Sequence, residues 1–474
     1  MSYRSNKLKK LNANYMPRAL SALGTLKYRI ILEGAAVGAM VGVIVSAFRY
    51  CLSKMDVLRD WIVSGEDRPS WAAYMGIGLL VLFAVLVSLF LKWEPLISGS
   101  GIPQVEGEFE GKIKPIWWRV LLLKFLGGLM AIGSGLALGR EGPSIQLGAM
   151  TGKGFSRLRG RYRSEERMLI AAGAGAGLAA AFGAPLAGLV FVLEEIYRVF
   201  DSKVLLSTLA ATIVADFISS IVFGLTPVIE ILSFSKPKLV DYWTIILLGI
   251  VIGVIGVLYN RSIAFMQDLM DRIRPAWIKA ILAVAAVILV ACVFPLGLGS
   301  GHGLIEGAAR GRFGLQLLAL LLAVKFIYCI FSFSTGAPGG IFLPLLVLGG
   351  LTGGLFTFLI SPSSAVDEAN IGFYVIIGMA GMFSAIVRAP LTGIILISEM
   401  TGALSNLLPL SLVALVSYIV AEALGGRPVY EQLLDRMLEK RASQQKGNPV
   451  RGKKVSPDSA GNVPSDIPGG ASEG

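Results

Sequence analysis

Blocks of apolar residues that are nearly free of Lys, Arg, Asp and Glu recur along the whole chain. A helix that crosses the hydrocarbon core of a bilayer needs about 20 mostly apolar residues. The blocks that approach this length lie at 30–48, 71–90, 205–223, 242–258, 278–294, 315–333 and 404–420. The pattern therefore predicts an all-α polytopic membrane protein.

Segments of the first half recur in the second half, in the same order, after a shift of roughly two hundred residues. The matched segments are 99–101 with 299–301, Lys124 with Lys325, 139–143 with 340–344, 184–188 with 389–393, and Glu194 with Glu399. Ordered self-similarity of this kind indicates an internal duplication.

The loops that follow the matched 139–143 and 340–344 segments differ in charge. Cytoplasmic loops near membrane spans are enriched in Lys and Arg. Six cations lie between 153 and 167, whereas the counterpart at 356–387 has no Lys or Arg and contains Asp367 and Glu368. We therefore expect an inverted repeat of two multi-helix halves, with interrupted intramembrane helices that place the substrate site near the bilayer midplane.

These boundaries divide the chain into four parts. A basic segment at 1–30 and a tail at 433–474 flank the first membrane repeat at 31–230 and the second, inverted repeat at 231–432. Lys and Arg are frequent in both end segments, so we expect both termini on the cytoplasmic side. The start has no signal-peptide pattern, and the tail, rich in Ser, Gly, Pro and charge, is predicted to be disordered.

Composition agrees with a bilayer protein, since 54% of residues are hydrophobic and only 16% are charged. The formal net charge of +12 comes mainly from cations beside apolar segments, so membrane topology explains it and no nucleic-acid partner is expected. The three cysteines and the single His302 lack metal-ligand spacing. We expect no metal site and no cofactor.

Glycine and proline interrupt the apolar pattern at three informative places. Irregular backbone inside a membrane must be buried in protein or line a cavity, and proline favours the start of a helix. We therefore expect helices to start at Pro103, Pro143 and Pro344. The free N–H groups and the dipole at helix starts form an anion site without Lys or Arg. Small residues also permit close helix packing, which is our interpretation of the Ala- and Gly-rich run 171–181.

Glu141 lies inside one interrupted segment, far from any predicted aqueous loop. An ionisable residue within a span costs about 2.5–3.5 kcal/mol and indicates function. Close to a helix start, its carboxylate would compete with an anion for the positive helix end, and protonation would release it. The alternative is a salt bridge with Arg140, although adjacent residues on a turn rarely face each other.

Other polar residues remain ambiguous on this reasoning. Glu194 and Glu195 end an apolar run near the expected cytoplasmic face, where they are either interfacial or functional. Tyr430, after the last apolar segment, is typical of an aromatic interface belt. Ser300 and His302 lie two residues apart in a glycine turn, which is a poor geometry for a nucleophile and its base, so we expect no enzyme.

The glycine-rich motifs resemble a known family. Segments 99–103, 139–143 and 340–344 are similar, in order and spacing, to the three selectivity-filter signatures of the CLC chloride channels and transporters. The resemblance runs from about 30 to 432 and implies the CLC fold and a homodimer with one pore per subunit. The implied filter residues, besides those with individual roles, are Gly99, Gly101, Ile102, Pro103, Gly139, Arg140, Gly142, Pro143, Gly340, Leu343 and Pro344.

The resemblance also implies a chloride-binding set. Ser100 would offer its hydroxyl, Ile341 and Phe342 their backbone N–H groups, and Tyr430 its phenol O–H. This role replaces the interface-belt interpretation of Tyr430. With a serine at position 100, the chain resembles the chloride-preferring members of the family.

Two glutamates carry the implied proton chemistry. Glu141 matches the external gating and proton-transfer glutamate, and Glu195 matches the internal proton-transfer glutamate of the exchangers. The stretch between them is one residue shorter than the bacterial pattern, which leaves Glu194 as an alternative. The expected function is chloride/proton antiport across a bacterial inner membrane, with chloride, protons and the lipid bilayer as partners. A passive gated chloride channel is the alternative.

Overall fold

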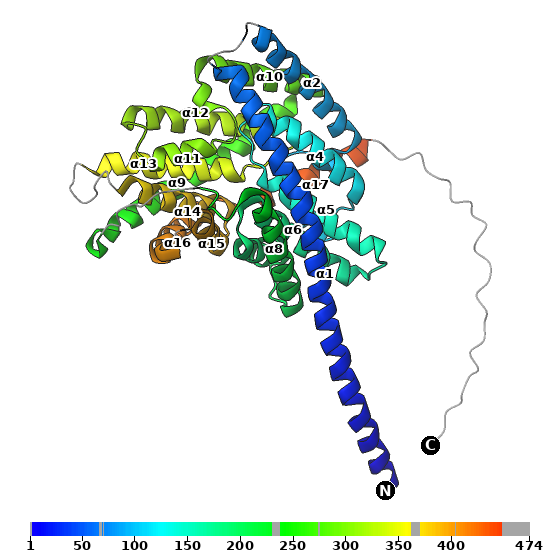
Figure 1. The fold of residues 1–474 in the computed structure, drawn as a ribbon. Helices are drawn as coiled ribbons and strands as arrows, with labels where there is room; N and C mark the ends of the chain where they lie inside the picture. The colour runs from blue at the N-terminus through cyan, green and yellow to red at the C-terminus, as the bar shows by residue number, and fades with distance from the viewer. Residues whose placement is uncertain are drawn as a thin grey trace, which may run out of the picture.

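The computed structural model describes residues 2–65, 69, 71–229, 238–273, 275–361, 370–402 and 404–447. Within these ranges the secondary structure is helical, apart from one pair of hydrogen-bonded glycines, Gly139 and Gly340. Figure 1 shows the helices gathered into one body, from which the N-terminal part of α1 projects. The expectation of an all-α fold is confirmed.

The helices of the first copy are α1 (Ser2–Ser64), α2 (Trp71–Trp93), α3 (Ile102–Phe109), α4 (Trp117–Gly133), α5 (Glu141–Leu158), α6 (Arg163–Phe182), α7 (Pro185–Phe191) and α8 (Ser202–Phe223). Those of the second copy are α9 (Trp243–Arg272), α10 (Ala276–Val293), α11 (His302–Ala309), α12 (Leu315–Ser334), α13 (Phe342–Ile360), α14 (Ile371–Val387), α15 (Pro390–Thr401) and α16 (Leu407–Ala423). A final helix, α17 (Val429–Gly447), follows them. The matched motifs occupy corresponding places in the two series, and α3 and α11 are both eight residues long.

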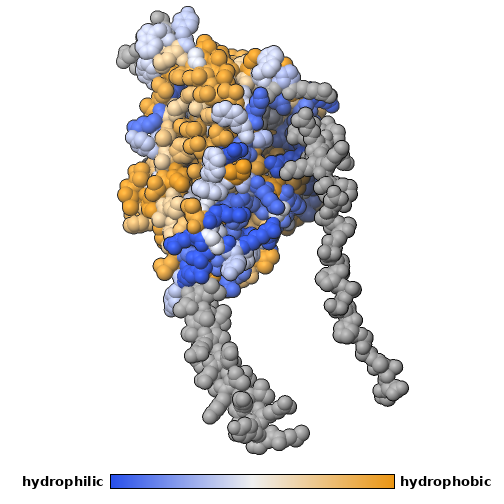
Figure 2. Space-filling view, turned by 90° about the vertical axis from the view of Figure 1, so that its right-hand side faces the viewer, coloured by the Kyte–Doolittle hydropathy of each residue, from blue (hydrophilic) through white to orange (hydrophobic). Residues whose placement is uncertain are grey.

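Six helices in the described part of the chain are long and apolar enough to cross a membrane. Five of them, in α1, α2, α8, α9 and α12, coincide with predicted spans, and the sixth is α13. The other two predicted spans are the shorter apolar helices α10 and α16. Figure 2 shows a broad hydrophobic surface with hydrophilic residues gathered toward one end, as expected of an integral, multi-pass membrane protein.

Equivalent positions of the two copies contact each other reciprocally. Gly139 and Gly340 each donate a backbone N–H to the other's carbonyl at 2.7 Å. The Glu194 carboxylate accepts N–H groups at the start of α15, from Leu391 and Thr392. The Glu399 carboxylate does the same at the start of α7, for Leu186 and Ala187. Reciprocal contacts require a two-fold relation, so a pseudo-two-fold axis relates the copies, as an inverted repeat demands.

Small residues bring α5 and α6 into backbone contact. A Cβ atom on Gly148 would collide with the carbonyl oxygen of Gly173, and one on Gly177 would collide with that of Ser144. The packing interpretation of the run 171–181 is therefore confirmed. Because α5 begins at Glu141, this tight pair fixes the position of that residue.

The C-terminal boundary differs from the sequence prediction. Helix α17 continues through Gly447, with Val429, Tyr430 and Leu434 buried, so the prediction of disorder is wrong for 433–447. Helix α17 packs against α3, where Leu434 lies next to Gly107, and composition alone did not indicate this contact. Residues 448–474 lie outside the described residues. At the N-terminal end, the predicted boundary at residue 30 does not coincide with the end of an element, because α1 continues through this residue.

Candidate anion site

The three predicted helix starts are confirmed, with each proline in the first turn. Pro103 is the second residue of α3, while Pro143 and Pro344 are the third residues of α5 and α13. None of the three helices has a side-chain cap at its N-terminus. The first N–H groups of a helix have no intrahelical partner, so these starts provide uncapped donors inside the protein.

Glu141 lies where α5 and α13 begin side by side. The Gly139–Gly340 hydrogen bonds join the segments that lead into the two helices. The Glu141 side chain is fully buried and interacts with the backbone N–H groups of its own residue and of Leu343. Neither carboxylate oxygen reaches hydrogen-bond geometry with a partner among the described residues. The carboxylate therefore occupies the positive end of two helices without being locked there.

Ser100 packs directly on the first turn of α5. Its side chain is 2% exposed, and its hydroxyl has no hydrogen-bond partner among the described residues. A Cβ atom on Gly142 would lie 2.6 Å from the Ser100 carbonyl oxygen, so only glycine permits this approach. The next residue, Gly101, has a φ of 98°, a left-handed conformation that turns the chain into α3.

Tyr430 reaches the same point from α17. Its side chain is fully buried, and its hydroxyl has no partner that meets hydrogen-bond geometry in the described part of the chain. The hydroxyl lies beside that of Ser100 and within electrostatic range of the Glu141 and Glu195 carboxylates. Buried polar groups in proteins normally have partners, so two adjacent unsatisfied hydroxyls indicate a ligand site.

Ile341 and Phe342 form the start of α13. Ile341 is the N-cap and Phe342 the first helical residue, and both are buried. The Phe342 ring packs against Phe182 at 5.3 Å and Phe383 at 4.7 Å between centroids. This packing fixes the backbone while its N–H groups stay uncapped.

Two buried lysines, which the sequence analysis identified only as matched positions of the duplication, hold the glycine loops. The Lys124 ammonium donates to the carbonyls of Ile97 at 2.8 Å and Gly99 at 2.6 Å. Its counterpart Lys325 donates to Gly299 at 2.7 Å. The recurrence of a lysine at matched positions in two apolar helices was the signal that could have revealed them.

The adjacent Glu194 and Glu195 have different environments. The Glu194 carboxylate accepts hydrogen bonds from the N–H groups of Leu391 and Thr392 and from the Thr392 hydroxyl, at 3.1, 2.7 and 2.7 Å. Glu195 is 5% exposed, and its Oε1 atom has no hydrogen-bond partner among described residues. It lies in a π-helical segment, Val192–Tyr197, a feature frequent at functional sites. Glu194 is thus a helix cap. Glu195, by contrast, keeps a carboxylate oxygen without a hydrogen-bond partner among the described residues.

Arg198 joins Glu195 to two further carboxylates that sequence reasoning missed. The guanidinium lies 2.9 Å from the carboxylates of Glu106 and Glu431, and 4.0 Å from Glu195. Arg198 has a φ of 53°, a left-handed conformation that is uncommon outside glycine. No spacing in the sequence indicates this cluster, because its members come from three separate elements.

Two cavities are lined in part by residues of the signature segments. A cavity of about 1260 Å³ reaches Gly99, Ser100 and Pro103. A second cavity, of about 460 Å³, is lined by Arg49, Arg140, Ser300, His302 and Leu343, among other residues. Among the described residues there is no cluster of His, Cys, Asp and Glu that could hold a metal ion.

Comparison with known proteins decides the family. Residues 82–422 match the family model described as voltage gated chloride channel. The chain belongs to this family, the CLC proteins. An H(+)/Cl(-) exchange transporter ClcA from Vibrio cholerae is 37% identical over 439 residues, which cover 89% of this chain and 92% of that protein. One from Salmonella arizonae is 33% identical over 457 residues, or 94% and 96% of the two chains.

Solved CLC structures have the same architecture. A slow cyanobacterial Cl-/H+ antiporter superposes with a TM-score of 0.81 at 33% identity, covering 87% of this chain and 99% of the other. A CLC-type fluoride/proton antiporter, 23% identical with a TM-score of 0.70, covers 85% and 97% and shares the fold. The CLC fold expected from the three signatures is therefore confirmed. The matched descriptions name a chloride channel family and exchange transporters.

Proposed function

We propose that this CLC protein exchanges chloride for protons across the membrane. The observation that carries the proposal is the buried Glu141 carboxylate at the joint start of α5 and α13. An anion and this carboxylate have the same preferred position, the uncapped N–H groups of the helix starts. Because protonation neutralises the carboxylate, proton binding and anion entry become coupled at one point.

In the proposed exchange, chloride is bound by four residues. The Ser100 and Tyr430 hydroxyls donate to chloride from one side, and the backbone N–H groups of Ile341 and Phe342 donate from the other. Both hydroxyls are buried without a hydrogen-bond partner in the described structure, which supports this role. The remaining signature residues shape the backbone, as the close approach of Gly142 to Ser100 illustrates. Neutral donors hold the anion without the strong attraction of a full cation.

In the same exchange, protons are carried by Glu141 and Glu195. Glu141 accepts the proton at the gate, and Glu195 exchanges it with the cytoplasm. The choice of Glu195 over Glu194 rests on hydrogen bonding, since Glu194 is committed to the start of α15. Tyr430 is within electrostatic range of both Glu141 and Glu195, which supports a proton path that passes near the anion site.

The assembly and location follow from the same proposal. All residues of the site come from one chain, so each subunit of a homodimer would have its own pore. The bacterial ClcA exchangers support location in a bacterial inner membrane. The cations before the first span and after the last one support a cytoplasmic location of both termini. Chloride, protons and lipid are then sufficient partners, without a cofactor.

Paired flux measurements test the proposal. The full chain is reconstituted into vesicles with a chloride gradient and no proton gradient, and chloride and proton movements are recorded together. We expect the chloride gradient to drive protons in the opposite direction to chloride. Chloride flux without proton movement would instead identify a passive channel, and the antiport proposal would be wrong.

A further inference from the structure

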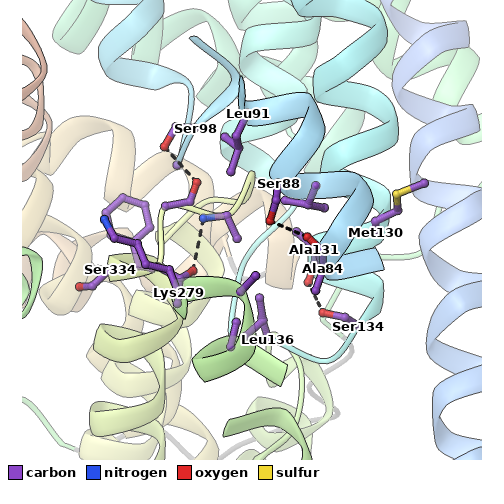
Figure 3. Close-up of a pocket in the computed structure, with 18 of the residues that line it drawn as sticks. Ala84, Ser88, Leu91, Ser98, Met130, Ala131, Ser134, Leu136, Lys279 and Ser334 are labelled. Carbon is purple, nitrogen blue, oxygen red and sulfur yellow. Dashed lines mark hydrogen bonds between the residues drawn. The ribbon is translucent and has the colours of Figure 1, made fainter. Parts of the chain in front are cut away.

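The larger cavity extends from the chloride site along α2 and α10. Its wall is mainly apolar and includes Ala84 and Leu91 of α2 and Ala283 and Ile288 of α10. Figure 3 shows Ser88 and Leu91 of α2 and Lys279 of α10 around this space. The Ser88 and Ser134 hydroxyls donate to backbone carbonyls at 2.7 Å, so neither presents a free donor to the cavity.

The cavity is bounded partly by the hydrophobic outer surface of the protein. Val81, Val85 and Leu89 of α2 line it and are 49%, 52% and 41% exposed. Ile281 of α10 lines it as well and is 56% exposed. In a membrane this surface faces lipid, so the cavity is accessible to an acyl chain from the bilayer.

At one end, the cavity is bounded by α17 and by the nearby ends of α2 and α10. Five cations line this end. These are Lys92, Lys279, Arg436, Lys440 and Arg441. The only carboxylate among the lining residues is Asp271, and it is shared by Arg436 at 2.5 Å, Lys440 at 2.7 Å and Lys279 at 3.8 Å.

The remaining two cations, Lys92 and Arg441, have no ion pair within the described residues. Arg436 has a second carboxylate, Asp268, at 2.6 Å, which does not line the cavity. The rim therefore carries an excess of positive charge beside an apolar groove. Such a combination complements an anionic headgroup joined to a hydrocarbon chain.

We propose that a phospholipid with an anionic headgroup binds in this cavity. The headgroup contacts Lys92 and Arg441 at the rim, and one acyl chain lies between α2 and α10. A volume of about 1260 Å³ exceeds the usual range of small-molecule pockets, roughly 300–1,000 Å³. A soluble anion would use the rim but not the apolar wall. The proposal concerns binding and does not depend on proton coupling.

Native mass spectrometry of the purified full chain tests this site. The probes are phosphatidylglycerol and phosphatidylcholine with identical acyl chains, mixed in equal amounts. We expect preferential retention of phosphatidylglycerol. Each cation near a membrane surface contributes about 1 kcal/mol of attraction to anionic lipid, so the double variant Lys92→Gln/Arg441→Gln should lower that retention about tenfold or more.

A matched variant separates this site from general surface charge. Arg159→Gln/Arg163→Gln removes two exposed arginines that do not line the cavity, and we expect it to retain phosphatidylglycerol like the parent protein. Equal retention of the two lipids by the parent, or equal losses in the two double variants, would overturn the proposal. Displacement by inorganic phosphate at equal concentration would identify a free-anion site instead.

A second variant tests the acyl groove with the rim unchanged. Ala84→Trp fills the wall between α2 and α10, so we expect phosphatidylglycerol retention to fall although all five cations remain. Retention at the parental level would contradict acyl-chain binding in the groove. Size-exclusion chromatography and circular dichroism show that each variant is folded, which keeps a loss of retention interpretable.

Discussion

The starts of α5 and α13 are two copies of one motif with different side chains at the decisive position. Gly139 pairs with Gly340, and Pro143 and Pro344 occupy the same place in their helices. At the first helical residue, however, the first copy has Glu141 and the second has Phe342. The duplication thus supplies two opposed helix starts. The difference between the copies at this one position, Glu141 in place of phenylalanine, supplies a titratable group.

The comparison separates the scaffold from the chemistry. Phe342 is held by aromatic packing, and its proposed contribution to the site is its backbone N–H group. Glu141 is equally buried, but its carboxylate has no complete hydrogen bond in the described structure. A binding surface therefore needs both helix starts, whereas a gate needs a carboxylate on only one.

The largest effect is expected for Glu141→Gln. The amide cannot carry a proton or present a negative charge to the helix starts, so proton transport should fall to the level of protein-free vesicles while chloride flux continues. Simultaneous recording with pH and chloride electrodes measures both. Proton movement that remains driven by the chloride gradient would remove Glu141 from the proton path.

A comparable loss of proton transport is expected for Glu195→Gln, again with chloride flux retained. Its matched control is Glu431→Gln, because Glu431 contacts the same Arg198 guanidinium but is 36% exposed. We expect the control to keep its coupling. Normal chloride/proton coupling in Glu195→Gln would contradict the proton-transfer role assigned to Glu195. An equal loss of coupling in both variants would contradict it as well.

A smaller effect is expected when the Ser100 hydroxyl is removed. A hydrogen bond to a charged group is worth about 1.5–3 kcal/mol, so Ser100→Ala should weaken chloride binding about tenfold or more in calorimetric titration. Ser300, the matched serine of the second copy, lines the smaller cavity. Ser300→Ala should leave the chloride affinity nearly unchanged, and equal effects in both variants would contradict the assignment of Ser100.

The smallest effects are expected at the reciprocal helix caps. Loss of an N-terminal cap costs about 1 kcal/mol, so Glu194→Gln and Glu399→Gln should each lower the free energy of unfolding by about that amount, without loss of proton coupling. Denaturant titration in detergent measures the stability. A loss of coupling in Glu194→Gln alone would transfer the internal proton role from Glu195 to Glu194.

Much of this architecture could be predicted from the sequence because it depends on local patterns. Apolar blocks located the spans in α1, α2, α8, α9 and α12 but missed the one in α13, and prolines located the starts of α3, α5 and α13. The matched lysines also gave a signal, but only the structure shows that Lys124 and Lys325 hold backbone carbonyls. The resemblance to CLC signatures was needed to bring Tyr430 into the site, since 330 residues separate it from Ser100.

The remaining features depend on tertiary contacts. Glu194 and Glu195 are identical neighbours in the sequence, and only the position of α15 distinguishes the cap from the uncommitted carboxylate. The helical part of the tail escaped prediction for the same reason. Its polar composition favoured disorder, but burial of Tyr430 and Leu434 against the body supports a helix.

The central claim is that Glu141 and the transported anion compete for one position between α5 and α13. Crystals of the parent protein and of Glu141→Gln, soaked in bromide, test it directly through anomalous scattering. The account predicts a bromide peak beside the N–H groups of Phe342 and Leu343 in Glu141→Gln and its absence at that position in the parent protein at neutral pH. Equal bromide occupancy there in both proteins, or none in either, would contradict it.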